Sequence, residues 1–171
     1  MNNIIIKNCV KLDEKIANKL DTETVFILEH IGIPNTTPMG IDVEVISNSY
    51  LYKENNIVLG ETKGEKLTHY LILNIIDNGV YFKWNYQDTP EKVFINSNIK
   101  SMLLCEFSYH FFIRRLISSK VLGAYYDNSD SGGNFEKYAC LLEDIIKDID
   151  ERAAKEGVWH SLIEEMKLGV I

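Results

Sequence analysis

The chain has 171 residues, of which 46% are hydrophobic and 25% are charged, and its formal net charge is −7. This length and composition suit one folded domain with a core of its own and exclude a disordered chain. No apolar run reaches the roughly 18 residues that span a bilayer, and the apolar stretch at 4–6 is too short for a secretion signal, so we expect a cytoplasmic protein.

The negative charge is concentrated in the last quarter of the chain. Residues 1–126 hold 14 acidic and 13 basic side chains, whereas residues 127–171 hold 11 acidic and 5 basic side chains, which gives −1 and −6. An acidic surface repels phosphate backbones, so direct binding to nucleic acid is not expected. The same surface would attract a basic protein.

Two helices are predicted near the start of the chain. The first spans 12–20, where apolar residues recur at helical spacing after acidic residues in the first turn. Asp21 interrupts this pattern and can cap a second helix over 23–31. Gly32 can end that helix, and Pro34 prevents its continuation.

Beyond a loop at 35–40 the apolar pattern changes to the alternation that is typical of strands. The turn at 77–79 contains Asn78-Gly79, which predicts a tight type I′ hairpin because both central residues of that turn need a positive φ. Polar turns are predicted at 53–56 and 61–66. The predicted strands are 41–46, 50–52, 57–59, 70–76, 80–86 and 93–95.

Helices are predicted for the rest of the chain. Asn96-Ser97-Asn98 opens a long helix that runs to about Ser119, and a flexible linker follows at 128–134. An amphipathic helix extends from 135 to 153, Gly157 ends it, and one or two further helical turns follow. The inward stripe predicted for the first of these helices is Ile99, Met102, Leu103, Phe107, Phe111, Arg114 and Ile117.

The order of these elements predicts the fold class. A helix pair, a run of strands and a run of helices, without strand–helix–strand alternation, argue against a parallel sheet. We therefore predict an α+β fold, in which a twisted, mostly antiparallel sheet packs against helices in a single domain over 1–171.

Motifs of enzymes and metal sites are not found. The chain has no GxGxxG motif and no Walker loop, the two glycine-rich patterns that bind nucleotides, and its four histidines lie outside the spacings of zinc sites. Cys9, Cys105 and Cys140 form no CxxC pair, and the last two lie among apolar helical neighbours, which predicts buried thiols. We expect no enzymatic activity, no cofactor and no metal, although a carboxylate or Cys–His site outside known motifs stays open.

Acidic residues on the C-terminal helices form a first set of candidate binding residues. Asp144 and Asp148 are four residues apart and share a helix face. A solvated face explains such residues most simply, and an acidic docking surface for a basic protein is the alternative. In the second interpretation the contact residues are Glu143, Asp144, Asp148 and Glu151.

Aromatic residues crowd the predicted hairpin and form a second set. Phe82, Trp84 and Tyr86 share one face of the strand, and Tyr81 lies on the other. One face has to pack in the core, whereas exposed tyrosine and tryptophan are preferred anchors of protein interfaces. The candidates are therefore Tyr81, Trp84 and Tyr86.

Five short motifs in order carry a family resemblance. They are LEHIGIP at 28–34, VLGE at 58–61, LILN at 71–74, NGVY at 78–81 and VFINSNI at 93–99. Over 22–119 the chain resembles the SUKH superfamily, most closely its fourth group. It departs from that pattern at Ile33, where leucine is typical, and at Asn98-Ile99, where serine and leucine are typical. The acidic helical part at 135–168 carries none of these motifs.

The resemblance implies a SUKH-like sheet packed against helices and the role of a bacterial immunity protein. Such a protein binds and neutralises a cognate polymorphic toxin, often a nuclease or a deaminase, by covering its active cleft. A basic cleft would suit an acidic inhibitor. Two alternatives stay open: a regulatory interaction module with an endogenous partner, and a small enzyme without a recognisable motif.

Overall fold

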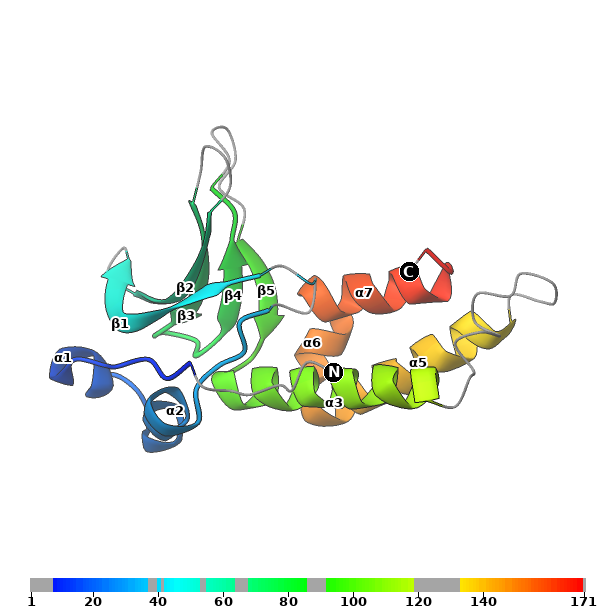
Figure 1. Ribbon diagram of the computed structural model, residues 1–171, viewed down its shortest axis with the longest axis horizontal. Helices are drawn as coiled ribbons and strands as arrows, with labels where there is room; N and C mark the ends of the chain where they lie inside the picture. Colours follow the sequence, from blue (N-terminus) through cyan, green and yellow to red (C-terminus); the bar gives the residue numbers. More distant parts are fainter. Residues whose placement is uncertain are drawn as a thin grey trace. The chain divides into compact units, whose positions relative to one another are not determined.

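The computed structural model confirms the α+β class with a five-stranded antiparallel sheet and several helices (Figure 1). The chain forms two compact units, Met1–Leu103 with the sheet and Leu104–Ile171 with helices. No helix within the described parts is both long and apolar enough to cross a membrane. The structure describes residues 8–36, 40, 42–52, 55–63, 68–85, 92–118 and 133–170.

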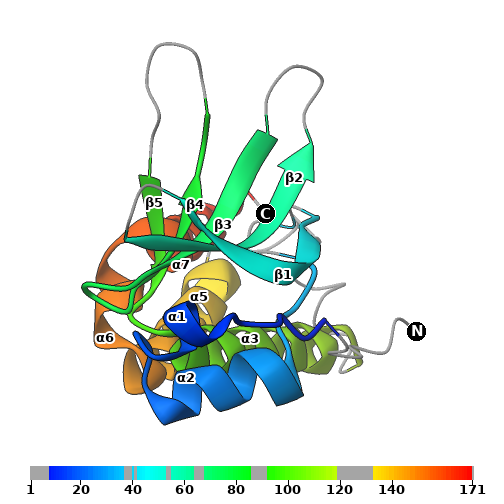
Figure 2. The same cartoon turned by 90° about the vertical axis from the view of Figure 1, so that its left-hand side faces the viewer.

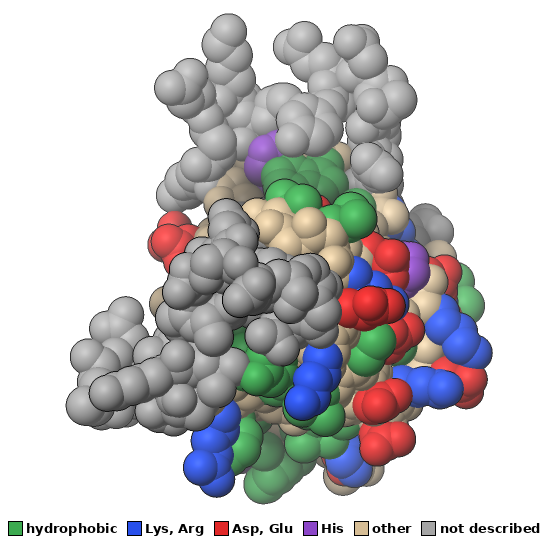
Figure 3. Space-filling view, turned by 90° about the vertical axis from the view of Figure 1, so that its right-hand side faces the viewer, with side chains coloured by type: hydrophobic (Ala, Val, Ile, Leu, Met, Phe, Trp, Pro, Cys, Tyr) green, Lys and Arg blue, Asp and Glu red, His purple; other side chains and the backbone are tan. Residues whose placement is uncertain are grey.

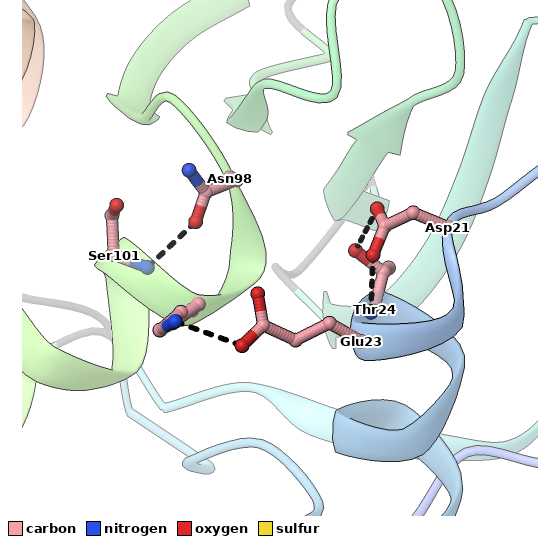
Figure 4. Close-up of polar contacts among 6 residues, drawn as sticks. Asp21, Glu23, Thr24, Asn98 and Ser101 are labelled. Carbon is pink, nitrogen blue, oxygen red and sulfur yellow. Dashed lines mark hydrogen bonds and ion pairs between the residues drawn. The ribbon is translucent and has the colours of Figure 1, made fainter.

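Two helical segments open the first unit. α1 (Glu14–Ala17) is a single turn, shorter than the predicted helix. The helix predicted over 23–31 is confirmed as α2 (Thr22–Phe26) followed by η1 (Ile27–Ile31), which has π-helical hydrogen bonding that the sequence pattern does not predict. The carboxylate of Asp21 caps α2 by accepting hydrogen bonds from the backbone amide and the hydroxyl of Thr24, at 2.8 Å and 2.7 Å (Figure 4).

The sheet has the strand order β1-β2-β3-β4-β5, and every neighbouring pair is antiparallel. Residues 44–46 and 50–52, from two of the predicted strands, belong to one strand, and the predicted turn at 61–66 begins within another. The strands are β1 (Glu44–Tyr52), β2 (Asn56–Lys63), β3 (Thr68–Asn74), β4 (Val80–Lys83) and β5 (Lys92–Asn96).

β1 leaves its neighbour in the middle of its length. Its pairing with β2 shifts between Val45 and Tyr50, so the residues between them lack partners on β2. Lys11 supplies these partners, because its amide donates to the carbonyl of Ser47 at 2.9 Å and its carbonyl accepts from the amide of Ser49 at 3.0 Å. The N-terminal segment therefore lies against β1 (Figure 2).

β2 contains a bulge next to a glycine that a neighbouring segment approaches closely. Val58 pairs with Ile72 of β3 and Gly60 pairs with Leu71, so Leu59 is an extra residue on β2. A Cβ atom at Gly60 would lie 2.3 Å from Cγ1 of Val43. Only glycine lets the chain before β1 come this close.

The predicted β3–β4 hairpin is confirmed, but its turn is not of type I′. Asn78 has a positive φ of 56°, whereas Gly79 does not. The side chains of Asn74 and Asp77 each accept a hydrogen bond from the backbone amide two residues further along, at 3.0 Å and 2.9 Å, and so stabilise a longer loop. Glycine is needed at 79 because a Cβ would lie 2.6 Å from the ring of Tyr81.

α3 (Ile99–Ser118) begins where the sequence predicts, but its inward stripe differs. Steps of four residues from Leu103 to Phe107 and Phe111 drift by about 40° each around a helix. Phe107 and Phe111 are accordingly 42% and 62% exposed, which corrects the prediction. The buried side continues through Cys105, Glu106, Phe112 and Leu116. Of the other predicted members, Ile99 and Met102 are buried, Arg114 is exposed, and the side chain of Ile117 lies outside the described residues.

The second unit has a break that the sequence pattern does not predict. The expected continuous helix over 135–153 ends at 149, because Asp150 is extended and caps the next helix through the amide of Ala153. Fully buried Trp159 anchors this unit, with its ring 5.7 Å from that of Tyr109. Residues 119–132, including most of the predicted linker, lie outside the described residues. The helices are α5 (Gly133–Ile149), α6 (Glu151–Lys155) and α7 (Gly157–Lys167).

The cap of α3 gives a test of this local structure. The side-chain oxygen of Asn98 accepts from the amide of Ser101 at 2.8 Å (Figure 4). We expect Asn98→Ala to lower the free energy of unfolding by about 1 kcal/mol, because one helix amide loses its partner. Urea denaturation followed by tryptophan fluorescence measures this. Asn98→Ser, which keeps a capping oxygen, should stay within a few tenths of a kcal/mol of the parent, and an equal loss in both variants would contradict the cap.

Candidate functional site

Five side chains from four consecutive strands gather on one face of the sheet. The pairing register places Glu61 of β2 opposite Tyr70 of β3, and Tyr70 opposite Lys83 of β4. Tyr50 and Tyr52, two positions apart on β1, point to the same face. We call these five residues the tyrosine cluster.

Hydrogen bonds and ring contacts hold the tyrosine cluster together. The hydroxyl of Tyr50 donates to Oε1 of Glu61 at 2.6 Å, and the rings of Tyr52 and Tyr70 lie 5.3 Å apart. The ammonium of Lys83 lies 4.7 Å from the centre of the Tyr52 ring and donates to its hydroxyl at 3.3 Å. The side chains are thus ordered before any partner binds, which reduces the entropy lost on binding.

The cluster is exposed enough to meet a partner. Tyr50 is 40% exposed, and the other four side chains are half-buried. Burial, together with the neighbouring Glu61 carboxylate, raises the pKa of the Tyr50 and Tyr70 hydroxyls above the usual 10. Both hydroxyls therefore stay protonated at neutral pH and act as neutral donors and acceptors.

The structure corrects one of the predicted aromatic sites. Tyr81 is 7% exposed, its hydroxyl donates to Asp77 at 2.6 Å, and its ring packs edge-on against Phe94. It therefore belongs to the core of the sheet rather than to an exposed surface. Trp84 is half-buried, with its ring 4.6 Å from that of Phe82, and Tyr86 lies outside the described residues.

The predicted acidic residues divide into two pairs. Glu143 and Glu151 form ion pairs, with Lys167 at 2.9 Å and with Lys155 at 2.6 Å. Asp144 and Asp148 are exposed and make no ion pair with any residue that the structure describes. Acidic and basic side chains are interspersed over the face shown in Figure 3, so the paired carboxylates contribute little net field.

An apolar groove lies between α3 and α5 in the second unit. Its volume is about 510 Å³, and Phe107, Phe111, Leu141 and Ile145 line it. Arg115, with its guanidinium 5.4 Å from the centre of the Phe111 ring, is the charged residue in this lining. The groove offers apolar contact area, but it has fewer directional groups for selecting a partner than the tyrosine cluster has.

The buried carboxyl group of Glu106 belongs neither to the tyrosine cluster nor to the apolar groove. Glu106 on α3 is 4% exposed, and its burial raises its pKa from 4.5 to about 8. His110 lies one helical turn further along, with its Nε2 3.7 Å from Oε2 of Glu106. Burial, together with the nearby charge of Arg114, lowers the pKa of His110. Both groups are therefore mainly neutral at pH 7, and the two side chains do not form an ion pair there despite their distance.

Metal ligands do not gather in the part of the chain that the structure describes, where no three histidine, cysteine or acidic side chains are close enough to bind one ion. Cys105 is buried as predicted, whereas Cys140 is exposed on α5, which corrects that prediction. The helical pattern around Cys140 did not show that the helix turns this position outward.

Most of the tyrosine cluster is missed by the sequence pattern. The segment that holds Glu61 has the polar composition of a turn, and Tyr50 and Tyr52 are assigned to a separate short strand. The alternation of two tyrosines on β1 is a usable signal for one exposed face. Cross-strand neighbours, however, depend on the register and on two bulges, which no motif marks.

Comparisons of the chain with protein-family models, with curated proteins and with solved structures found no significant match. The resemblance to the SUKH superfamily therefore stays a prediction.

The buried carboxyl group leads to a prediction about pH. Between pH 4.5 and about 8 the folded chain keeps the Glu106 proton and the unfolded chain has lost it, so stability falls as pH rises through this window. The slope is up to about 1.4 kcal/mol per pH unit. Urea denaturation of Glu106→Gln should show a much smaller fall than the parent, with the greatest relative stabilisation at pH 8. Glu165→Gln, at an exposed position, should keep the parental slope, and equal slopes in the parent and in Glu106→Gln would contradict this prediction.

Proposed function

We propose that this chain is an immunity protein that binds a basic protein toxin through the tyrosine cluster and blocks the toxin's active cleft. The observation that carries this proposal is the cluster itself on an accessible sheet face: Glu61 bonds Tyr50, Lys83 bonds Tyr52, and the Tyr70 ring packs against that of Tyr52.

The composition of the cluster favours protein recognition. Tyrosine supplies a large rigid ring and a polar tip at low entropic cost, and it is enriched among the residues that dominate binding energy. Tyr50 and Tyr70 both contribute partly exposed rings. Neighbours that already hold them in place limit what an approaching partner has to order.

The acidity of these phenols favours binding over catalysis. A tyrosine that acts as a general base needs a pKa lowered toward neutrality. The pKa values of Tyr50 and Tyr70 are shifted in the opposite direction, by burial and by the Glu61 carboxylate. Hydroxyl groups that stay protonated over a wide range of pH suit a binding interface, because their hydrogen bonds do not change with pH.

The net charge of −7 supports a basic partner. Long-range attraction between an acidic inhibitor and the basic cleft of a nuclease increases the rate of encounter, while ring anchors slow dissociation. The resemblance to SUKH immunity proteins points to the same class of partner, a nuclease or a deaminase toxin.

Removal of the tyrosine rings tests the proposal. We expect the purified chain to bind the toxin encoded by the neighbouring gene, and Tyr50→Ala and Tyr70→Ala each to weaken binding by at least about tenfold, as for buried interface anchors. Calorimetry at low salt measures the affinities. Ile76→Ala removes an exposed apolar side chain from the same unit and should leave affinity unchanged. Absence of binding at micromolar concentration would refute the proposal.

Asp144 and Asp148 give a separate test of electrostatic steering. Neutralising both with Asp144→Asn and Asp148→Asn should lower the association rate constant several-fold at low salt and leave dissociation unchanged, because these exposed acids act at long range. Stopped-flow kinetics with the same toxin measures both constants. The charge-conserving pair Asp144→Glu and Asp148→Glu should match the parent. A decrease that persists in about 1 M salt, where charges are screened within roughly 3 Å, would contradict steering.

A further inference from the structure

Glu61 is a carboxylate without a cation among the residues that the structure describes. Its side chain is half-buried and accepts a hydrogen bond from the Tyr50 hydroxyl at 2.6 Å. A carboxylate has about four lone-pair sites, so this bond leaves most of its accepting capacity available. The β1–β2 register places a second acidic residue, Glu44, opposite Glu61. A half-buried negative charge attracts a cation from outside more strongly than a fully hydrated one does.

Lys83 shows that this face can hold a cation. Its ammonium lies over the ring of Tyr52 and donates to the hydroxyl of the same residue. The contacts of Lys83 are with Tyr52 and not with Glu61, so one part of the tyrosine cluster has an internal cation and the part around Glu61, Tyr50 and Tyr70 has none within the described chain.

We propose that this second part receives an arginine side chain of the partner, whose guanidinium binds the Glu61 carboxylate and stacks on the rings of Tyr50 and Tyr70. This inference rests on the proposed function, since it names the group of the toxin that the tyrosine cluster recognises. Charge complementarity selects a cation for this position, and the flanking rings select a flat one.

Arginine fits better than lysine for physical reasons. A guanidinium is planar, forms two parallel hydrogen bonds with a carboxylate, and stacks on aromatic faces with a small loss of hydration. An ammonium is compact and strongly hydrated, and it makes no paired bonds. Arginine is also enriched among the residues that dominate binding energy, as is tyrosine.

A small probe tests this inference directly. We expect N-acetyl-arginine amide, titrated into the full chain, to shift the ring resonances of Tyr50 and Tyr70 in NMR spectra with a dissociation constant in the millimolar range. The citrulline analogue has the same shape without the charge and should bind at least about fivefold more weakly, because the charge-assisted hydrogen bonds are lost. The lysine analogue should also bind more weakly than arginine.

Glu61→Gln is the matched variant, because glutamine keeps the size of the side chain and one oxygen that can accept from Tyr50, while it removes the charge and the second acceptor oxygen that paired binding needs. It should abolish the difference between the arginine and citrulline probes, whereas Glu14→Gln, at an exposed acid on α1, should preserve it. Equal arginine binding by the parent and by Glu61→Gln, or shifts confined to other residues, would overturn the inference.

The toxin separates this inference from the proposed function. If both hold, Glu61→Gln weakens toxin binding by at least about tenfold, as expected for loss of a charge-assisted pair. If the toxin binds and depends on Tyr50 but not on Glu61, the arginine inference fails and the proposed function stands. If the toxin does not bind at all, the proposed function is refuted, and the arginine inference, which rests on it, is refuted as well.

Discussion

The extra residue in β2 is the constraint on which the candidate site depends. Because Leu59 is inserted between two paired positions, the register beyond it places Glu61 opposite Tyr70. Gly60 lies within this bulge, where its lack of a side chain leaves room for Val43, and the bulge itself moves the register by one residue. Without it, the period of two would carry Glu61 to the opposite face of the sheet and away from Tyr50. One inserted residue thus sets the position of the Glu61 carboxylate in the tyrosine cluster.

Polar chemistry is distributed differently in the two units. In the sheet unit, partly exposed phenols and a carboxylate support one another through contacts between strands. In the helical unit, the carboxyl group of Glu106 is buried and neutral at pH 7, while exposed Phe107 and Phe111 border an apolar groove. The first arrangement favours selective recognition of a charged partner. The second places an ionisable group where it affects stability rather than contact with a partner.

The sequence predicts those elements whose signals are local. The α+β class, the cap at Asp21, the β3–β4 hairpin and the start of α3 follow from apolar periodicity and capping chemistry. Side-chain orientation in α3 beyond Leu103 is not predicted, because the angular drift grows with each four-residue step and places Phe107 and Phe111 at the surface. Tyr81 is wrongly expected at the surface, because alternation identifies the two faces of a strand but not which face is covered. In the centre of this sheet the side chains on both faces are buried. The tyrosine cluster itself depends on long-range register, which composition does not encode.

The contact of Lys11 with β1 has a consequence for how partners can approach. β1 is an outer strand, and its middle carbonyl and amide groups at Ser47 and Ser49 are already bonded to the N-terminal segment. An unprotected outer strand would invite another chain to extend the sheet, which is a common route both to peptide capture and to self-association. Here the chain occupies part of that route with its own backbone, so the groups at Ser47 and Ser49 are closed to main-chain pairing with a partner.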